Sequence, residues 1–139
     1  MKNFKIFPNV HIGKNCFIDD YSILGIPPKG AKKGEFETFI GKNSYIRSHT
    51  VIYAGNKIGN NFQTGHQVII REFNEIGDDV SIGTNSVVEH HTRIGNGVRL
   101  HSNAFVPEFS ILEDGVWIGP NVVLTNALHP LCPKAKECL

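Results

Sequence analysis

The sequence lacks the features that mark a membrane protein, a disulfide scaffold or a nucleic-acid-binding surface. No apolar run approaches the roughly 18 residues that a membrane span needs, and the first residues do not lead into a signal-peptide core. Three cysteines in 139 residues are too few for a disulfide framework, and their odd number suits a reducing compartment. A net charge of +1 offers no basic surface for nucleic acid. We therefore expect one cytoplasmic domain that binds neither a membrane nor a nucleic acid.

What the sequence has instead is a six-residue repeat. Steps of six residues from 40 to 124 meet an aliphatic residue at fourteen of fifteen positions, and only Thr64 departs from the pattern. These aliphatic residues are Ile40, Ile46, Ile52, Ile58, Ile70, Ile76, Ile82, Val88, Ile94, Leu100, Val106, Leu112, Ile118 and Leu124. A helical period of 3.6 residues cannot keep this phase, whereas a short strand followed by a tight turn can. The repeat therefore predicts an all-β chain of short strands.

The repeat is interrupted once. A first block with the same spacing covers residues 6–24, but it is out of phase with the second because Leu24 and Ile40 are sixteen residues apart. Between them lies GIPPKGAKKGEFETF, whose prolines, glycines and lysines are typical of a loop. We therefore divide the single domain, residues 1–139, into a first block 6–24, a loop excursion 25–39, main coils 40–126 and a terminal loop 127–139.

The spacing resembles that of the hexapeptide-repeat acyltransferases, and the resemblance covers residues 6–130. The fold of that family is a left-handed parallel β-helix, in which three hexads form one triangular coil and the aliphatic residue of each hexad points inward. The resemblance implies about five to six full coils in this chain. It also implies a homotrimer, because members of the family trimerise and a narrow solenoid buries only a thin aliphatic column.

One corner of the implied β-helix has an unusual composition. Residues eighteen apart would lie above one another at a strand spacing of ~4.8 Å, which defines three corners. Two of them are rich in Asn, Asp and Gly, which supply the positive φ of tight turns. The third corner carries two other columns: Ala54, Glu72, His90, Glu108, Asn126 and Gly55, Phe73, His91, Phe109, Ala127. The solenoid needs no imidazole between carboxylates, so this corner is the candidate site; the alternative is a solvated charge ladder beside phenylalanines of a subunit interface.

His90 is the first candidate for a catalytic base. An imidazole changes its protonation near neutral pH, and a neighbouring carboxylate fixes its tautomer and raises its basicity. We expect Glu72 or Glu108, each one coil away, to hold the His90 imidazole. The segment VEHHTRIG also resembles a hexad of the nucleotide-amino-sugar N-acetyltransferases, and this resemblance implies that His90 is the base.

Two further histidines compete with His90. The segment TNALHP resembles the sugar O-acetyltransferases, in which a His-Pro pair carries the catalytic histidine, and this implies His129. The alternative for His129 is a loop that ends the solenoid. His66 in TGHQV replaces a turn residue beside Thr64, which indicates a locally opened core or a substrate groove. The sequence leaves the choice among the three histidines open.

Five polar residues are candidates for contact with substrate or coenzyme. They are Arg47, Tyr53, Asn56, Arg71 and Asn126. The first four are expected on or next to the edge of the third corner, where an arginine suits recognition of a diphosphate. The alternative for each is an ordinary solvated surface residue.

The resemblance implies an acyltransferase that uses acetyl-CoA as co-substrate and needs no metal. We expect it to N-acetylate a nucleotide-activated amino sugar; a sugar O-acetyltransferase and a non-catalytic trimeric β-helix that binds a sugar are alternatives. A zinc protein like the γ-class carbonic anhydrases requires two histidines five residues apart, and the sequence has none so spaced. His129, Cys132 and Cys138 have a spacing that could hold zinc, although a fourth ligand is missing.

The end of the chain bears on the coenzyme site. Acetyltransferases of this type usually continue for further coils after the segment that corresponds to NALHP, and those coils help to hold the coenzyme. This sequence ends at Leu139. We therefore expect either a shortened chain or a reduced coenzyme site.

Overall fold

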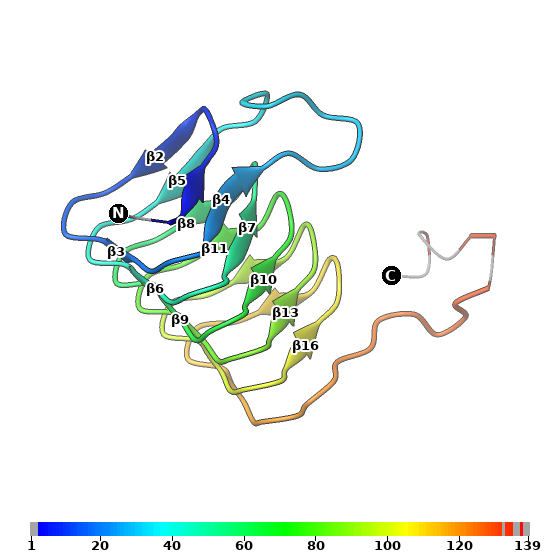
Figure 1. Ribbon diagram of the computed structural model, residues 1–139. Coiled ribbons are helices and arrows are strands. Elements are labelled where there is room, and N and C mark those ends of the chain that lie inside the picture. The colour runs from blue at the N-terminus through cyan, green and yellow to red at the C-terminus, as the bar shows by residue number, and fades with distance from the viewer. Residues whose placement is uncertain (1–2, 132, 135–136, 138–139) are drawn as a thin grey trace.

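The computed structural model describes residues 3–131, 133–134 and 137, and within them the chain forms eighteen short strands. The strands make three parallel six-stranded sheets around one axis, so the chain is a left-handed parallel β-helix of six coils (Figure 1). The predicted fold class is confirmed. None of the described residues belongs to a helix long and apolar enough to cross a membrane.

Each sheet forms one side of the triangular coil. Sheet A contains β1 (Lys5–Ile6), β4 (Ile23–Ile26), β7 (Val51–Tyr53), β10 (Ile69–Ile70), β13 (Val87–Val88) and β16 (Phe105–Val106). Sheet B contains β2 (Val10–Ile12), β5 (Thr38–Ile40), β8 (Lys57–Ile58), β11 (Glu75–Ile76), β14 (Arg93–Ile94) and β17 (Ile111–Leu112). Sheet C contains β3 (Phe17–Ile18), β6 (Tyr45–Ile46), β9 (Gln63–Thr64), β12 (Ser81–Ile82), β15 (Arg99–Leu100) and β18 (Trp117–Ile118). The chain turns from B to C at the first corner, from C to A at the second, and from A to B at the third.

The strands of successive coils pair in parallel with a constant offset of eighteen residues, as Ile69 does with Val87. In the three strand pairs that span the insertion, β2–β5, β3–β6 and β4–β7, the offset is 28 residues, ten more than in the other pairs. The extra residues lie in loop 27–37, which is shorter than the predicted excursion 25–39 because β4 and β5 extend into its two ends. The change of phase is therefore an insertion within one solenoid.

The aliphatic column fills the centre of the coils, as the repeat predicts. Its members from Leu24 to Leu112 are all at most 9% exposed. Thr64, the polar exception, is also buried; its Oγ1 lies 3.1 Å from Thr50 Oγ1 and accepts a hydrogen bond from the Arg47 backbone N–H. These hydrogen bonds replace contact with water. The core is therefore closed at Thr64, so the predicted opening of the core is absent, whereas Thr64 and His66 do line a surface groove, the other predicted alternative.

The third corner makes the same turns as the other two, although its side chains differ. At the first corner Asn61 and Asp79 adopt left-handed φ values of 56° and 58°, which Asn and Asp tolerate. At the third corner Phe73, His91 and Phe109 adopt φ values of 59°, 55° and 59°. A left-handed backbone costs a residue with a Cβ roughly 1–2 kcal/mol. The turn itself therefore does not favour the aromatic side chains found there.

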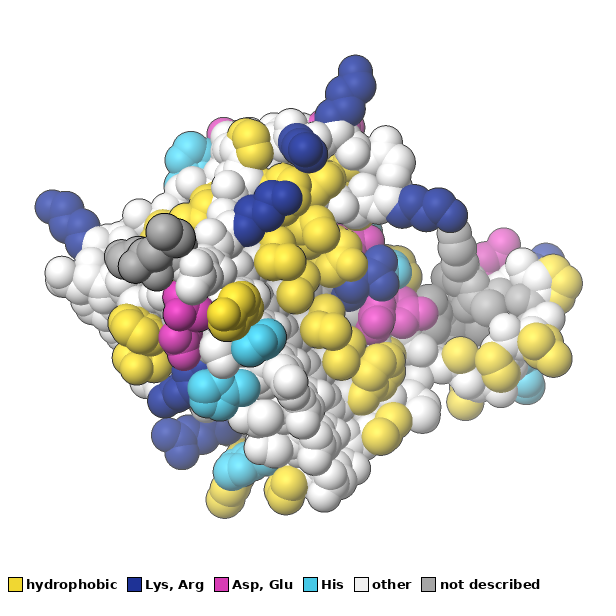
Figure 2. All heavy atoms as spheres, in the orientation of Figure 1, with side chains coloured by type: hydrophobic (Ala, Val, Ile, Leu, Met, Phe, Trp, Pro, Cys, Tyr) yellow, Lys and Arg dark blue, Asp and Glu magenta, His cyan; other side chains and the backbone are white. Residues whose placement is uncertain are grey.

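The outward-facing side chains of sheet A are apolar in five successive coils. This apolar strip consists of Ile23, Val51, Ile69, Val87 and Phe105. Figure 2 shows hydrophobic side chains gathered over these strands, which carry the labels β4 to β16 in Figure 1. Sheet B instead presents charged residues in three successive coils, namely Lys57, Glu75 and Arg93. A contiguous apolar strip of this kind is typical of surfaces through which proteins associate.

Candidate active site

His90 and His91 stand next to each other at the third corner, between β13 and β14. Their Nδ1 atoms lie 2.8 Å apart, within hydrogen-bond distance, and their rings are nearly perpendicular at 88°. Only one of the two Nδ1 atoms can carry the hydrogen of this bond. When His90 donates it, the Nε2 atom of His90 keeps a free lone pair and can accept a proton. The pair can therefore present a base at the surface of the corner.

The Glu72 carboxylate, one coil from His90, is held by Arg71. The Arg71 guanidinium donates to both carboxylate oxygens of Glu72, at 2.9 and 3.0 Å, and also donates to Glu89 at 3.3 Å. Burial would raise the pKa of Glu72, but hydrogen bonds from Arg71 and its own backbone, with the charges of Arg71 and His90, hold that pKa below its ordinary value. The hydrogen bond to Glu72 raises the pKa of Arg71, against the opposing effect of burial. The charge of His90 is the smallest of the influences that lower the Glu72 pKa, and Arg71 is the main partner of this carboxylate.

Neither predicted carboxylate forms a hydrogen bond with the imidazole of His90. Within the part of the chain that the structure describes, the single hydrogen bond of this ring joins its Nδ1 atom to Nδ1 of His91. Glu108 is half-buried, and its carbonyl oxygen accepts a hydrogen bond of 2.6 Å from the Asn126 side chain. The expectation that a carboxylate holds the ring is thus not met, because Arg71 engages Glu72 and His91 takes the place of the carboxylate.

An aromatic column runs beside the histidine pair, along the left-handed turn positions. Phe73 packs against His91 with ring centroids 5.1 Å apart, and His91 stacks on Phe109 at 5.4 Å. Phe36, from loop 27–37, meets the Phe73 ring edge-on at 4.8 Å. Phe36 and Phe73 also line a hollow between the loop and the corner. The loop therefore supplies one wall of the candidate site, which the sequence did not reveal.

The predicted binding residues do not all share this corner. The Arg71 guanidinium lies 5.2 Å from the centroid of the Tyr53 ring, and its donors already serve two carboxylates, so Arg71 organises the corner. Asn56 is fully buried, and its Nδ2 donates to the carbonyl oxygens of Tyr53 and Arg71. Asn56 therefore supports the turn and cannot reach a substrate. Arg47 directly follows β6 and therefore lies at the second corner. The third corner comes only after β7, the next strand along the chain.

The two competing histidines have simpler surroundings. His66 lies at the second corner, where its Nδ1 is 2.8 Å from Ser48 Oγ. His129 is exposed in the terminal segment and forms no hydrogen bond with a described residue. Cys132 and Cys138 lie outside the described residues, and the described residues contain no group of three His, Cys, Asp or Glu that could hold a metal ion. Of the three candidates, His90 has the surroundings best suited to a base.

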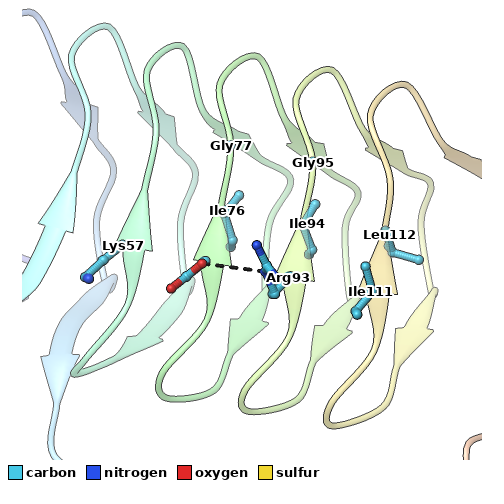
Figure 3. A pocket seen from close by; sticks show the side chains of 9 residues that line it. Lys57, Ile76, Gly77, Arg93, Ile94, Gly95, Ile111 and Leu112 are labelled. Atoms are coloured by element: carbon cyan, nitrogen blue, oxygen red, sulfur yellow. Dashed lines mark ion pairs between the residues drawn. The ribbon is translucent and has the colours of Figure 1, made fainter.

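A shallow hollow on sheet B lies apart from these residues. Figure 3 shows it lined by Lys57, Arg93 and Ile111 among others. The Nε atom of Arg93 lies 3.7 Å from Oε2 of Glu75. Both charged side chains are more than 60% exposed, so this ion pair contributes little. None of the predicted site residues lines this hollow.

The repeat and the fold have known counterparts. Residues 75–108 match the family model described as bacterial transferase hexapeptide (six repeats), whereas no curated protein matches the chain. A UDP-N-acetylglucosamine acyltransferase from Bacteroides fragilis shares the fold with a TM-score of 0.83 and 24% identity over 91% of this chain, which spans about half (52%) of that protein. An N-acyltransferase from Bacillus cereus, solved with dTDP and coenzyme A, gives a TM-score of 0.71 and 20% identity over 86% of this chain and 74% of its own. The chain therefore carries the hexapeptide repeat of the bacterial transferases and has the left-handed β-helix fold of these two acyltransferases.

Proposed function

We propose that this protein is an acyltransferase that uses acetyl-CoA to acetylate the amino group of a nucleotide-activated sugar, with His90 as general base. The observation that carries the proposal is the His90–His91 hydrogen bond, at a corner whose side chains the solenoid does not require. The Bacillus cereus neighbour was solved with coenzyme A and dTDP, which supports both the coenzyme and a nucleotide-linked acceptor. The Bacteroides fragilis neighbour, a UDP-N-acetylglucosamine acyltransferase, supports a nucleotide-linked sugar as the acceptor.

His90 acts through its Nε2 atom in this proposal. As the acceptor nitrogen forms its bond to the thioester carbonyl carbon, Nε2 takes the proton that the nitrogen releases, and the protonated ring then gives a proton to the departing thiolate. His91 accepts the hydrogen bond from His90 Nδ1 and so keeps the ring in the required tautomer.

We also infer a homotrimer in which a neighbouring protomer covers the apolar strip of sheet A. Each strand of this sheet leads directly into the third corner, as β13 leads into His90. A neighbour on the strip would therefore border the histidine pair and keep water away from it. The family resemblance implies three-fold symmetry, and the apolar strip offers a surface for it.

A thiol-release screen tests the proposed activity. The protein is incubated with acetyl-CoA and, one at a time, with nucleotide-linked amino sugars and their hydroxyl counterparts, and free coenzyme A is followed with a thiol reagent. Release that requires an amino sugar and yields the acetamido product supports the proposal. Release with hydroxyl acceptors alone would replace N-acetylation by O-acetylation, and sugar binding without release would identify a non-catalytic module.

A further inference from the structure

A groove runs over sheet C and the second corner, one side of the triangle away from His90. It is lined by residues of four successive coils, among them Arg47, His66, Ser81 and Arg99. Its outward-facing ladder continues to Trp117 on the next coil, which pairs in register with Arg99. The proposed acyl transfer uses none of these residues.

The charge of this groove is one-sided. Its charged and titratable lining residues are Arg47, His66, Arg99 and His101, and the described lining includes no carboxylate. The groove therefore carries the permanent positive charges of Arg47 and Arg99, and no negative side chain of its described lining balances them. A lining of this kind attracts anions.

The arginines of the groove also differ from the other arginines of the chain in their partners. Arg71 and Arg93 form ion pairs with glutamates. Among the described residues, Arg47 and Arg99 form none. An unpaired guanidinium keeps its donors available for the planar, two-pronged hydrogen bonding that phosphate oxygens accept.

Arg47 is held in a fixed position at one end of the groove. Its Nη1 donates to the Thr64 carbonyl oxygen at 2.7 Å, and its guanidinium lies 4.7 Å from the centroid of the Tyr45 ring. The remaining N–H groups of Arg47 have no partner within the described residues, so they can serve a ligand. A guanidinium fixed in this way loses less side-chain entropy on binding.

The other end of the groove offers an exposed ring. The Trp117 side chain is 71% exposed, and its ring centroid lies 5.2 Å from that of His101. Because Arg99 and Trp117 are register partners on adjacent strands, their backbones are about 4.8 Å apart. An indole and a guanidinium on neighbouring strands suit a ligand in which a planar ring is attached to a phosphate.

We infer that this groove binds a phosphate ester, with phosphate groups on Arg99 and Arg47 and the attached ring on Trp117. The two arginines are three coils apart, roughly 14 Å at the strand spacing, which favours an extended ligand over a single inorganic phosphate. A nucleoside diphosphate and coenzyme A both have this chemistry. The inference deepens the proposed function, which requires both, but it concerns binding and can be tested without acyl transfer.

Fluorescence provides the first test, because Trp117 is the single tryptophan of the chain. The protein is titrated with pyrophosphate, a nucleoside diphosphate, coenzyme A and dephospho-coenzyme A, and binding is checked by calorimetry. We expect at least one ring-bearing ligand to quench Trp117 and to bind at least about tenfold more tightly than pyrophosphate, because the ring adds stacking. Preference for coenzyme A over dephospho-coenzyme A identifies the coenzyme as the source of the phosphate, and preference for the nucleoside diphosphate identifies the acceptor. Absence of binding for all four ligands would overturn the inference.

Two arginine variants provide the matched second test. Arg99→Gln should weaken binding of the preferred ligand by about tenfold or more, the effect of losing charge-assisted hydrogen bonds. Arg93→Gln removes the same charge from the same coil, but on sheet B, and should leave the affinity unchanged. Both side chains are on the surface, so both variants should have the melting temperature of the wild type. Equal losses in the two variants would show a general charge effect and overturn the assigned site, whereas binding that persists in a protein without acyl transfer would refute only the proposed function.

Discussion

Phe73, His91 and Phe109 occupy turn positions that suit Asn, Asp or Gly better. Each pays roughly 1–2 kcal/mol for its left-handed backbone. Stacking along the column offsets this by roughly 0.5–1.5 kcal/mol per aromatic pair, so the rings bring little or no net stability. Residues held in such conformations cluster at functional sites. The aromatic column is therefore better explained by the chemistry of the corner than by the fold.

The first prediction follows from this balance and concerns Phe109, which is 48% exposed. Phe109→Asn should leave the melting temperature unchanged or raise it, because Asn tolerates the left-handed turn, and this gain offsets the loss of the ring contacts with His90 and His91. The reverse change at the second corner, Asn103→Phe, should lower the melting temperature, since it strains the turn and removes the Asn103–Asn121 hydrogen bond of 3.1 Å. Thermal unfolding followed by circular dichroism measures both. A clear drop in Phe109→Asn would mean that the column serves stability.

Glu72 gives a second prediction, on the pH dependence of stability. Its pKa in the folded protein lies below the ordinary value of 4.5, so the stabilisation it provides is fully present above about pH 4.5 and is lost as the pH falls through the lower folded value. Glu72→Gln should lower the free energy of unfolding at neutral pH and flatten its decline in acid. The control is Glu75→Gln, whose side chain is 62% exposed and whose ion pair is long. The free energy of unfolding is measured by urea unfolding at several pH values. An identical decline in acid for the wild type and Glu72→Gln would contradict the lowered pKa of Glu72.

At the scale of strands and corners, the eighteen-residue spacing predicted where side chains lie better than it predicted their hydrogen-bond partners. It placed Glu72 and His90 one coil apart on one corner, as the structure confirms. Spacing alone does not determine which donor binds a carboxylate. The Glu72 carboxylate accepts hydrogen bonds from Arg71, its neighbour in the sequence. The ion pair between Arg71 and Glu89 spans eighteen residues, so the same column arithmetic could have found it.

Loop 27–37 shows the limit of composition as a guide. Its prolines and glycines predicted a loop, and the change in the phase of the repeat gave the number of inserted residues. Nothing in that pattern gives the direction in which a loop folds, because its turns are fixed by contacts with distant residues. The contact between Phe36 and Phe73, which brings the loop over the third corner, was therefore visible only in the structure.

At the scale of the whole molecule, the apolar strip of sheet A gives a third prediction. Ile69→Glu places a charge at the centre of the strip, where covering it in a dry interface would cost several kcal/mol. We expect the wild type to sediment as a trimer and Ile69→Glu as a monomer. Ile111→Glu makes the same exchange on sheet B, at a side chain that is 67% exposed, and should remain trimeric. A monomeric wild type, or loss of the trimer in Ile111→Glu alone, would place the interface elsewhere.

The turnover of His90→Asn tests the central claim most directly. With the acceptor that supports thiol release, this variant should lose turnover by roughly 10²–10⁴-fold, the usual contribution of a general base. Its assembly and melting temperature should match the wild type, since the half-buried ring lies outside the aliphatic core. Turnover near the wild-type value in His90→Asn, with loss of activity in His129→Asn instead, would contradict the claim and move the base to the terminal segment.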